Sequence, residues 1–384
     1  MCVALVTTLV IASYSVTTTS AAHKSTNVPV DVSPSTRTSD NGLDMYTING
    51  APFGVYTPIR VLTFNSAQFR VKIGLAKNAI DGGEEKTSAM CHSTTGCVAA
   101  VNGDFFDVTD TGQPDVGDEV GGITQNCVLL HTPEIPHEQV NLDGGVVTNT
   151  FNWSSTLDVN NTSVSVTAIN QELPMSYLNV DVPLSGTLLY TAQYALKTPS
   201  APNRLNYEFV KVGGTTSPTA INTTSELKLV GETQNPVRVT PNHVDISASV
   251  GSALDSLSVG DTVSLTTTST AGCNDIGGHP ILLNNGIVGP INRADTYMAT
   301  PCARTIIGWT ASGETVIMSI AGIDTKSGAT MYQMVTLLLS QNVVTAIDLD
   351  GGGSTSLYAN GRLVYPPAKE QRPVSTALLV MQDS

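Results

Sequence analysis

The sequence predicts an α+β protein, with a mixed or antiparallel β-sheet core, a few packed helices and an inserted β-rich subdomain. Three observations support this fold class. Charged residues make up 13% of the 384 residues, about half the usual globular share of roughly 25%. Thr, Ser, Asn, Val and Gly fill the gap, as suits strands and turns. Hairpin signals rather than helices join most predicted strands, which argues against a doubly wound parallel sheet.

Residues 1–22 are interpreted as a signal peptide. Met1–Ile11 is almost entirely apolar or Thr, and Ser20-Ala21-Ala22 supplies the small residues that a signal peptidase prefers. No basic residue precedes Lys24, so a mis-assigned start or a membrane anchor stays open, although the apolar run is short for a bilayer span. We expect a secreted, extracellular protein without a stable membrane anchor after signal removal, and a flexible leader at 23–42.

Residues 43–147 are predicted to form the first part of a main domain. Its expected elements are strands at Arg60–Phe64 and Phe69–Ala76, a helix at Thr87–Ser93 and a strand at Val98–Val101. Residues 148–270 differ, because Thr, Val, Asn and Pro dominate while apolar residues still alternate, as at Ser163–Thr167. We interpret this range as the inserted β-rich subdomain, with one or two helical turns at Ser249–Leu257.

Residues 271–384 are predicted to form the second part of the main domain. Asn-Gly or Ser-Gly pairs predict three hairpins, which join Pro280–Leu283 to Ile287–Val288, Thr305–Thr310 to Thr315–Ile320, and Thr355–Ala359 to Arg362–Tyr365. Apolar residues at helical spacing predict a helix over Met331–Leu339, with Ser327 as its N-cap. Strands at Val343–Leu349 and Ser375–Val380 complete the domain.

The sharpest chemical motif is Asp348-Leu349-Asp350, followed by Gly351, Gly352, Gly353, Ser354 and Thr355. On a strand, Asp348 and Asp350 face the same side about 7 Å apart, so each carboxylate disfavours ionisation of the other. Three glycines let the backbone approach a ligand and present its amides. A solvated turn is the alternative, but a turn rarely needs three glycines beside two acids.

Other candidate residues also lie at predicted strand ends. Asn102 and Asp104 end one apolar strand, where they are either functional or turn-forming. Arg304 and Arg372 each precede a strand, and together they would clamp a phosphate; either one alone reads as a surface ion pair. His279 is interpreted as a loop residue rather than a catalyst.

Charge and missing motifs exclude several functions. The net charge is −14, from 18 basic and 32 acidic residues, without a basic cluster, which disfavours nucleic acid and anionic membranes as partners. No phosphate-binding loop, H-E-x-x-H or G-x-S-x-G motif occurs. We expect no metal and no cofactor. A weak calcium site is the alternative at an acidic loop that does not match the EF-hand spacing, formed by Asp107, Asp110, Asp115, Asp118 and Glu119.

Cysteines support an oxidising compartment. Beyond Cys2 there are five, so one should stay unpaired. Cys91 and Cys97 flank a short turn and are expected to form a disulfide. Cys273 and Cys302 are a second plausible pair, which would leave Cys127 free. No zinc-binding spacing is present.

Five stretches together resemble the phosphodiester glycosidase family in sequence, order and spacing, over roughly Leu43 to Val380. They are Ala99–Asp107, Gly277–Gly286, Ala303–Trp309, Asp348–Tyr358 and Arg372–Val380. The resemblance implies hydrolysis of a sugar-1-phosphodiester, of the GlcNAc-1-phosphodiester kind, at the anomeric carbon, with a small-molecule or polymer substrate. By family motif the site would be lined by Asn102, Asp104, Arg304, Asp350, Gly351, Gly352, Gly353, Ser354, Thr355 and Arg372.

The implied reaction gives the charged residues distinct roles, and one departure from the family pattern leaves an alternative function open. A phosphate ester leaves as an anion, so cations and amides should receive its charge, while Asp350 or Asp348 attacks C1 or activates water. Many family members carry a D-G-R run where this chain has Ala321-Gly322-Ile323. That departure favours the alternative function, a non-catalytic exported protein that binds glycans or glycopolymers on the same fold.

Overall fold

The structure is a computed structural model that describes residues 34–40, 42–48, 58–108, 117–134, 137–171, 186–198, 201–214, 217–322, 327–366 and 370–382. The predicted signal peptide and most of the predicted leader lie outside these ranges, as does Ile323. Among the described residues, no helix is long and apolar enough to cross a membrane.

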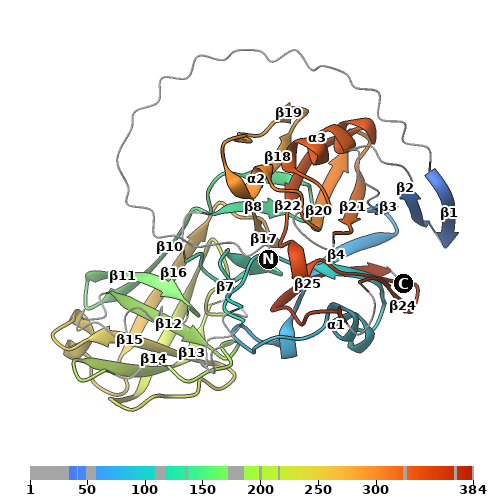
Figure 1. The fold of residues 1–384 in the computed structure, drawn as a ribbon. Helices are drawn as coiled ribbons and strands as arrows, with labels where there is room; N and C mark the ends of the chain where they lie inside the picture. The colour runs from blue at the N-terminus through green and yellow to red at the C-terminus, as the bar shows by residue number, and fades with distance from the viewer. Residues whose placement is uncertain are drawn as a thin grey trace.

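The described residues form three open sheets and one closed barrel, so the fold is strongly β-rich with few helices (Figure 1). The largest sheet is antiparallel throughout. Its strand order is β1 (Pro34–Asp40), β2 (Leu43–Ile48), β3 (Ile59–Asn65), β21 (Glu314–Ile320), β20 (Arg304–Thr310), β22 (Val343–Asp348), β18 (Ile281–Asn284) and β19 (Ile287–Val288).

Two five-stranded antiparallel sheets pack beside it. One has the order β24 (Arg362–Tyr365), β23 (Leu357–Ala359), β5 (Cys97–Asn102), β25 (Thr376–Gln382) and β4 (Phe69–Leu75). The other has the order β7 (Val128–His131), β6 (Ile123–Gln125), β17 (Asp275–Gly278), β8 (Glu138–Asn141) and β9 (Val146–Thr148). Apolar side chains from all three sheets form one buried cluster, which includes Leu62, Val101, Ile276, Ile307 and Leu378.

The barrel stands to one side of the sheets, at the lower left of Figure 1. It closes through β10 (Trp153–Val159), β11 (Thr162–Ile169), β12 (Thr187–Thr191), β15 (His243–Ser249), β13 (Arg204–Gly213), β14 (Thr223–Thr233) and β16 (Thr262–Ser269). Alternate residues of these strands fill its interior, for example Leu157, Phe209 and Ile246, as the period of two in a strand requires. These strands lie inside the range 148–270.

Short helices cover the sheets. Helix α1 (Thr87–Ser93) has the predicted bounds and packs on the sheet that contains β5. Helix α3 (Met331–Ser340) packs its apolar face against the largest sheet. The predicted N-cap Ser327 is wrong, because Thr330 caps α3 in a capping box with Gln333. A further helix is α2 (Thr296–Ala299), and 3-10 turns occur at Ala76–Asn78, Ala253–Ser256 and Gly352–Ser354.

The predicted flexible leader also needs correction at its end. Pro34–Asp40 forms β1 and pairs with β2 in antiparallel register. Arg37 forms an ion pair with Asp44 across this pair, and Thr38 Oγ1 donates to Met45 O at 3.2 Å. The polar composition of this segment predicted a flexible leader. A strand at the edge of a sheet can be polar, however, because it pairs with one neighbouring strand and its other side faces solvent.

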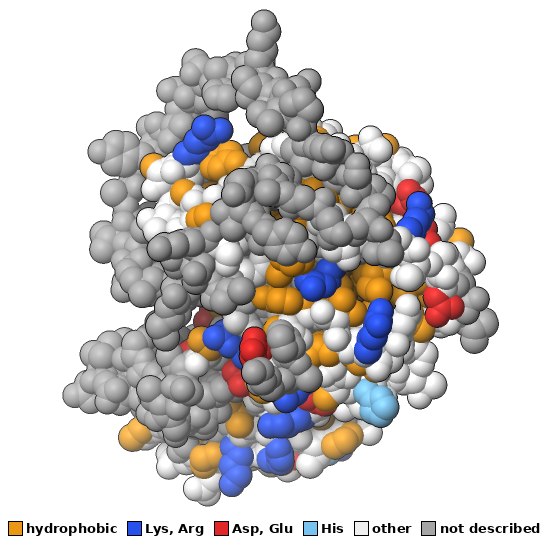
Figure 2. Space-filling model, turned by 45° about the vertical axis from the view of Figure 1, so that its right-hand side comes forward, with side chains coloured by type: hydrophobic (Ala, Val, Ile, Leu, Met, Phe, Trp, Pro, Cys, Tyr) orange, Lys and Arg blue, Asp and Glu red, His pale blue; other side chains and the backbone are white. Residues whose placement is uncertain are grey.

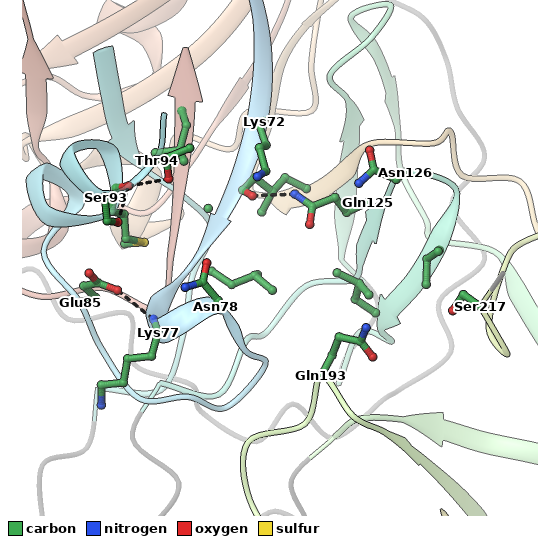
Figure 3. A pocket seen from close by; sticks show the side chains of 17 residues that line it. Lys72, Lys77, Asn78, Glu85, Ser93, Thr94, Gln125, Asn126, Gln193 and Ser217 are labelled. Carbon is green, nitrogen blue, oxygen red and sulfur yellow. Dashed lines mark hydrogen bonds between the residues drawn. The ribbon is translucent and has the colours of Figure 1, made fainter. Parts of the chain in front are cut away.

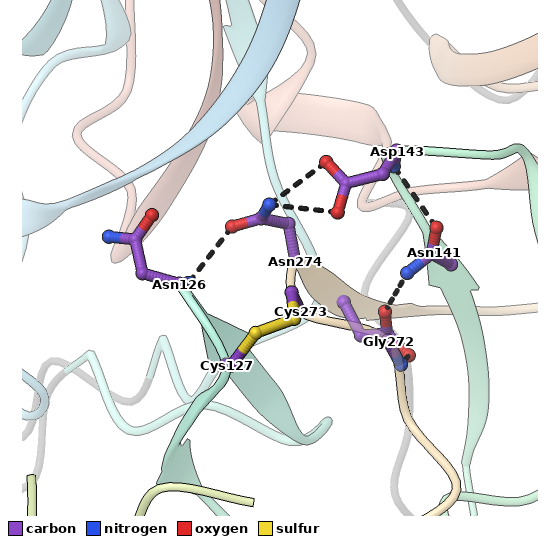
Figure 4. The surroundings of a disulfide bond; sticks show 8 residues. Asn126, Cys127, Asn141, Asp143, Gly272, Cys273 and Asn274 are labelled. Atoms are coloured by element: carbon purple, nitrogen blue, oxygen red, sulfur yellow. Dashed lines mark hydrogen bonds between the residues drawn. A yellow bond between two sulfur atoms is a disulfide. The ribbon is translucent and has the colours of Figure 1, made fainter. Parts of the chain in front are cut away.

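Two disulfides join the described residues. Cys91–Cys97 is confirmed. The predicted Cys273–Cys302 pair and the free Cys127 are wrong, because Cys127 bonds to Cys273 (Figure 4). Cys127 lies in the turn between β6 and β7, and Cys273 follows the last barrel strand, so this bond clamps the exit of the barrel to a sheet. Asn274 accepts from the Asn126 amide at 3.0 Å beside it.

The two disulfides should differ in their contribution to stability. The chain-entropy model gives about 5 kcal/mol for the Cys127–Cys273 separation of 146 residues and about 2 kcal/mol for the Cys91–Cys97 separation of 6. We expect the Cys127→Ser/Cys273→Ser variant to lose more unfolding free energy than the Cys91→Ser/Cys97→Ser variant. Urea titration measures both, and equal losses would contradict this assignment.

Candidate active site

The candidate site lies where two sheets meet at their strand ends. β22 ends at Asp348 and β20 begins at Arg304 in the largest sheet, while β5 ends at Asn102 in its neighbour. Backbone bonds join these ends: Asp350 N donates to Gly103 O at 3.1 Å, and Leu349 N donates to Thr305 O at 2.8 Å. Residues from distant parts of the chain therefore share one location.

Asn102 is the side chain that ties these ends together. It is 1% exposed, and its Nδ2 donates to Asp350 O at 2.6 Å. Its Oδ1 accepts from Thr305 Oγ1 at 2.6 Å and from Ser356 N at 3.1 Å. Because both ends of the amide are bonded to protein, Asn102 holds the glycine turn in place.

The glycine turn carries Asp350 and brings Arg372 next to it. Asp350 is partly exposed, and its Oδ1 accepts from Gly351 N at 2.7 Å. Gly352 has a left-handed φ of 58°. A Cβ at Gly353 would lie 2.7 Å from Arg372 Cζ, so the exposed guanidinium rests directly on the glycine. Arg372 Nη1 also donates to Ser354 Oγ at 3.3 Å.

Arg304 is close to this turn but faces the protein interior. It is 1% exposed, and Nη1 donates to Asp348 Oδ2 at 3.4 Å. Nη2 donates to Tyr297 O at 2.9 Å and to Thr300 O at 3.2 Å, and Nε donates to Ala329 O at 3.3 Å. The guanidinium is thus bonded to protein acceptors at each nitrogen, unlike that of Arg372.

The two acids of the motif differ in environment. Asp348 is fully buried; burial raises its pKa to about 7, against the lowering effect of Arg304 and of the Tyr297 hydroxyl, which donates to its Oδ2 at 3.1 Å. Burial raises the pKa of Asp350 to about 6, while Ser354, the Gly351 amide and Arg372 lower it. Asp350 is therefore the acid of this motif that combines solvent access with ionisation near neutral pH.

Asp104 lies in a tight cradle beside these acids. It is 2% exposed, and its Oδ1 lies 3.1 Å from His137 Nε2. A Cβ at Gly121 would lie 2.1 Å from Asp104 Oδ2, and one at Gly277 would lie 1.9 Å from it. Burial lowers the pKa of His137, but the charge and hydrogen bond of Asp104 outweigh burial and raise it. Negative charge on Asp104 in turn raises the pKa of Asp350.

Four aromatic rings border the candidate site. No sequence motif had assigned them to it. Phe105, His137, His279 and Tyr297 lie with ring centroids 6.0 to 6.3 Å apart. Arg304 Cζ lies 4.6 Å from the Tyr297 ring centre. His279 had a weak signal in its Gly-Gly-His-Pro context, whereas no pattern pointed to Tyr297. The remaining predicted residue Thr355 is buried here, and its Oγ1 has no partner among the described residues.

The acidic loop is only partly described, since Asp110 and Asp115 lie outside the described ranges. Asp118 lies 3.7 Å from His131 Nε2, and Glu119 accepts from Ser375 Oγ. Burial and the charge of Asp104 raise the pKa of Glu119 well above its ordinary value. Within the described part of the chain, no group of three or more His, Cys, Asp or Glu side chains is placed to hold a metal ion.

Two cavities lie apart from the candidate site residues. One of about 700 Å³ is lined by polar side chains such as Lys72, Asn78, Gln125 and Gln193 (Figure 3). Another of about 690 Å³ lies near Trp309 and Asp143. No predicted site residue lines either one. Figure 2 shows Lys and Arg side chains on one face, several of them beside Asp and Glu side chains. The predicted site residues therefore lie at the strand ends and outside both of these cavities.

Comparison with protein families finds a match that includes much of the candidate site. Residues 209–381, less than half of the chain, match the family model described as phosphodiester glycosidase. Over this range the chain is similar to the phosphodiester glycosidases. The matched range includes Arg304, Asp348, Asp350 and Arg372, and it starts inside the barrel.

Individual relatives extend this result. Over 80 residues the chain is 39% identical to the bovine N-acetylglucosamine-1-phosphodiester alpha-N-acetylglucosaminidase. This segment is 21% of this chain and 15% of the bovine protein. A hypothetical protein from Synechocystis superposes with a TM-score of 0.69 at 18% identity, over 89% of this chain and 62% of that one. A Burkholderia pseudomallei protein described as exported superposes with a TM-score of 0.63 at 16% sequence identity. The match covers 85% of this chain and 74% of that one. The two structural similarities show the fold.

The cradle around Asp104 should be sensitive to a single methyl group. Gly277→Ala would place Cβ within 2.8 Å of His137 Cδ2 as well as against Asp104, so we expect a loss of about 1–3 kcal/mol in unfolding free energy. Gly231→Ala is the control, since nothing lies within 4 Å of its added Cβ. Denaturant titration compares them, and equal stability of the two variants would show that the cradle is loose.

Proposed function

We propose that this chain is a hydrolase that cleaves a sugar-1-phosphodiester at the anomeric carbon and releases the sugar and a phosphomonoester. The observation that carries the proposal is the glycine turn, which places a partly exposed carboxyl, Asp350, beside an exposed guanidinium, Arg372. The named activity of the bovine relative suggests N-acetylglucosamine as the sugar. No metal or other cofactor is needed for the steps below.

Arg372 and the turn would bind the diester. Its phosphate is negatively charged before and during the reaction, and a guanidinium forms paired bonds to such a group. Arg372 rests on the turn that carries Asp350. With the phosphate bound to Arg372, the anomeric carbon would lie next to Asp350. The leaving group departs as an anion, and cationic and amide donors stabilise the charge that develops on it.

Asp350 would act on the anomeric carbon, either by direct attack or by activating water. Burial of Asp348 and Asp104 removes them from contact with substrate, so their roles are to shape the charge around Asp350. Arg304 would hold Asp348 and Tyr297 rather than the phosphate, because its nitrogens already bond to protein acceptors. Asn102 would position the turn instead of binding sugar.

We also propose that the protein acts outside the cell. Two disulfides in the described residues are typical of an oxidising compartment, and the Burkholderia neighbour of similar fold is described as exported. The substrate would then be an extracellular glycoside phosphodiester, either a small molecule or part of a polymer.

The direct test is release of N-acetylglucosamine from UDP-N-acetylglucosamine or a chromogenic N-acetylglucosamine-1-phosphodiester. We expect turnover without added metal. Binding of glycopolymers without any release from these substrates would support the alternative of a non-catalytic glycan-binding protein, which the missing D-G-R run favours.

Substitutions should separate the roles of the partly exposed Asp350 and the exposed Arg372. Asp350→Asn preserves shape but cannot attack or accept a proton, so we expect kcat to fall by about 10²–10⁴-fold with KM within about tenfold. Arg372→Ala should raise KM by about tenfold or more, because a charged hydrogen bond to the diester is lost. Steady-state kinetics measures both, with the exposed Arg362→Ala as control. Full activity in Asp350→Asn would remove this carboxyl from the mechanism.

The pH profile should report the ionisation of Asp350. Its pKa is raised to about 6, so kcat/KM should rise about tenfold per pH unit below 6 and level off above it. Arg372 lowers this pKa, so Arg372→Ala should move the midpoint to higher pH. Rates measured from pH 4 to 8 test this, and a midpoint that stays in place or moves down would contradict the placement of Arg372.

A further inference from the structure

Two histidine–carboxylate pairs border the candidate site, and they differ in their access to solvent. His137 Nε2 lies 3.1 Å from Asp104 Oδ1, with its side chain 7% exposed. His279 Nδ1 lies 2.7 Å from Glu138 Oε2, with its side chain 39% exposed. Only the second pair leaves a ring open to a substrate or to water.

The His279 ring is held in a defined orientation. Gly278 and Glu138 face each other across β17 and β8, which brings the carboxylate to the ring. Burial raises the pKa of Glu138, but the hydrogen bond and charge of His279 outweigh burial and lower it, so the carboxylate stays ionised. With Nδ1 bonded to Glu138, Nε2 is the free nitrogen, and no described residue forms a hydrogen bond to it.

His279 is also anchored to the end of β22, just before the glycine turn. His279 N donates to Asp348 O at 2.9 Å, and the ring stacks on Tyr297 with centroids 6.1 Å apart and planes at 22°. The Tyr297 hydroxyl donates to Asp348 Oδ2. Asp350 follows two residues after Asp348, so the ring and the reacting carboxyl are fixed to the same short segment.

We propose that His279 is a catalytic residue that removes the proton from the water attacking the anomeric carbon, with Glu138 as its positioning residue. This inference rests on the proposed function. In the hydrolytic step, the water oxygen bonds to C1 and its proton passes to His279 Nε2. The bond between C1 and the departing oxygen breaks, and its electron pair goes to that oxygen. The imidazolium then returns its proton to solvent.

His137 cannot take this role, because its Nε2 is already bonded to Asp104 and the ring is buried. A carboxylate at Nδ1 and an open Nε2 is the arrangement that fixes the tautomer of a histidine base. The pair of His279 with Glu138 has this arrangement, and Asp350 then remains available for the anomeric carbon.

The test is kinetic and includes chemical rescue. His279→Ala should lower kcat by about 10²–10⁴-fold with little change in KM, and added imidazole should restore part of the rate, because the removed ring was accessible. Glu138→Gln should give a smaller loss. The matched control is His243→Ala on the barrel, where His243 Nδ1 lies 2.6 Å from Glu208 and the side chain is 29% exposed; its rate should equal that of the wild type.

The outcomes separate this inference from the proposed function. If the wild type does not hydrolyse the diester, the proposed function fails first. If the wild type is active and folded His279→Ala keeps its rate within about twofold, the inference is overturned. A loss that imidazole does not rescue, in a variant with unchanged circular dichroism, assigns His279 a structural role and also overturns it.

Discussion

The site depends on one buried amide. Asn102 joins the end of β5 to the start of β20 and to the glycine turn through bonds to Asp350 O, Thr305 Oγ1 and Ser356 N. A buried amide without partners would cost several kcal/mol in apolar surroundings, so the two sheets must meet in the register that satisfies it. The position of Asp350 follows from that register, because Asp350 lies on the turn that Asn102 fixes. Arg372 comes from another segment and packs against Gly353 of the same turn.

Burial then separates residues that look alike in sequence. Arg304 starts a strand and Arg372 precedes one, yet Arg304 is bonded to protein at every nitrogen and Arg372 is exposed. The same contrast holds for the acids, because Asp348 is buried while Asp350 reaches solvent. It also holds for His137 and His279. In each pair, one member is held by protein contacts and the other is open to solvent.

Sequence patterns anticipated features that depend on local interactions. The bounds of α1 and the hairpin at Asn285-Gly286 follow from short-range periodicity and turn chemistry, and the structure confirms them. Features that depend on long-range packing could not be anticipated in this way. The bond from Cys127 to Cys273 joins segments 146 residues apart, and no spacing rule selects it. The motif residues lie together where two sheets meet, but only the contacts showed that Arg304 faces inward and that Glu138 bonds to the His279 ring.

The acids of the site also oppose stability. Asp348 and Asp350 have pKa values of about 7 and about 6, above the value near 3.8 that they have when exposed. The folded chain therefore binds these protons more tightly than the unfolded chain, so their contribution to stability is full below about pH 4 and is lost as pH rises through 6 and 7. A site designed only for stability would neutralise or expose these groups. Burial instead keeps the pKa of Asp350 at about 6, while Arg304 and Tyr297 limit the cost of burying Asp348.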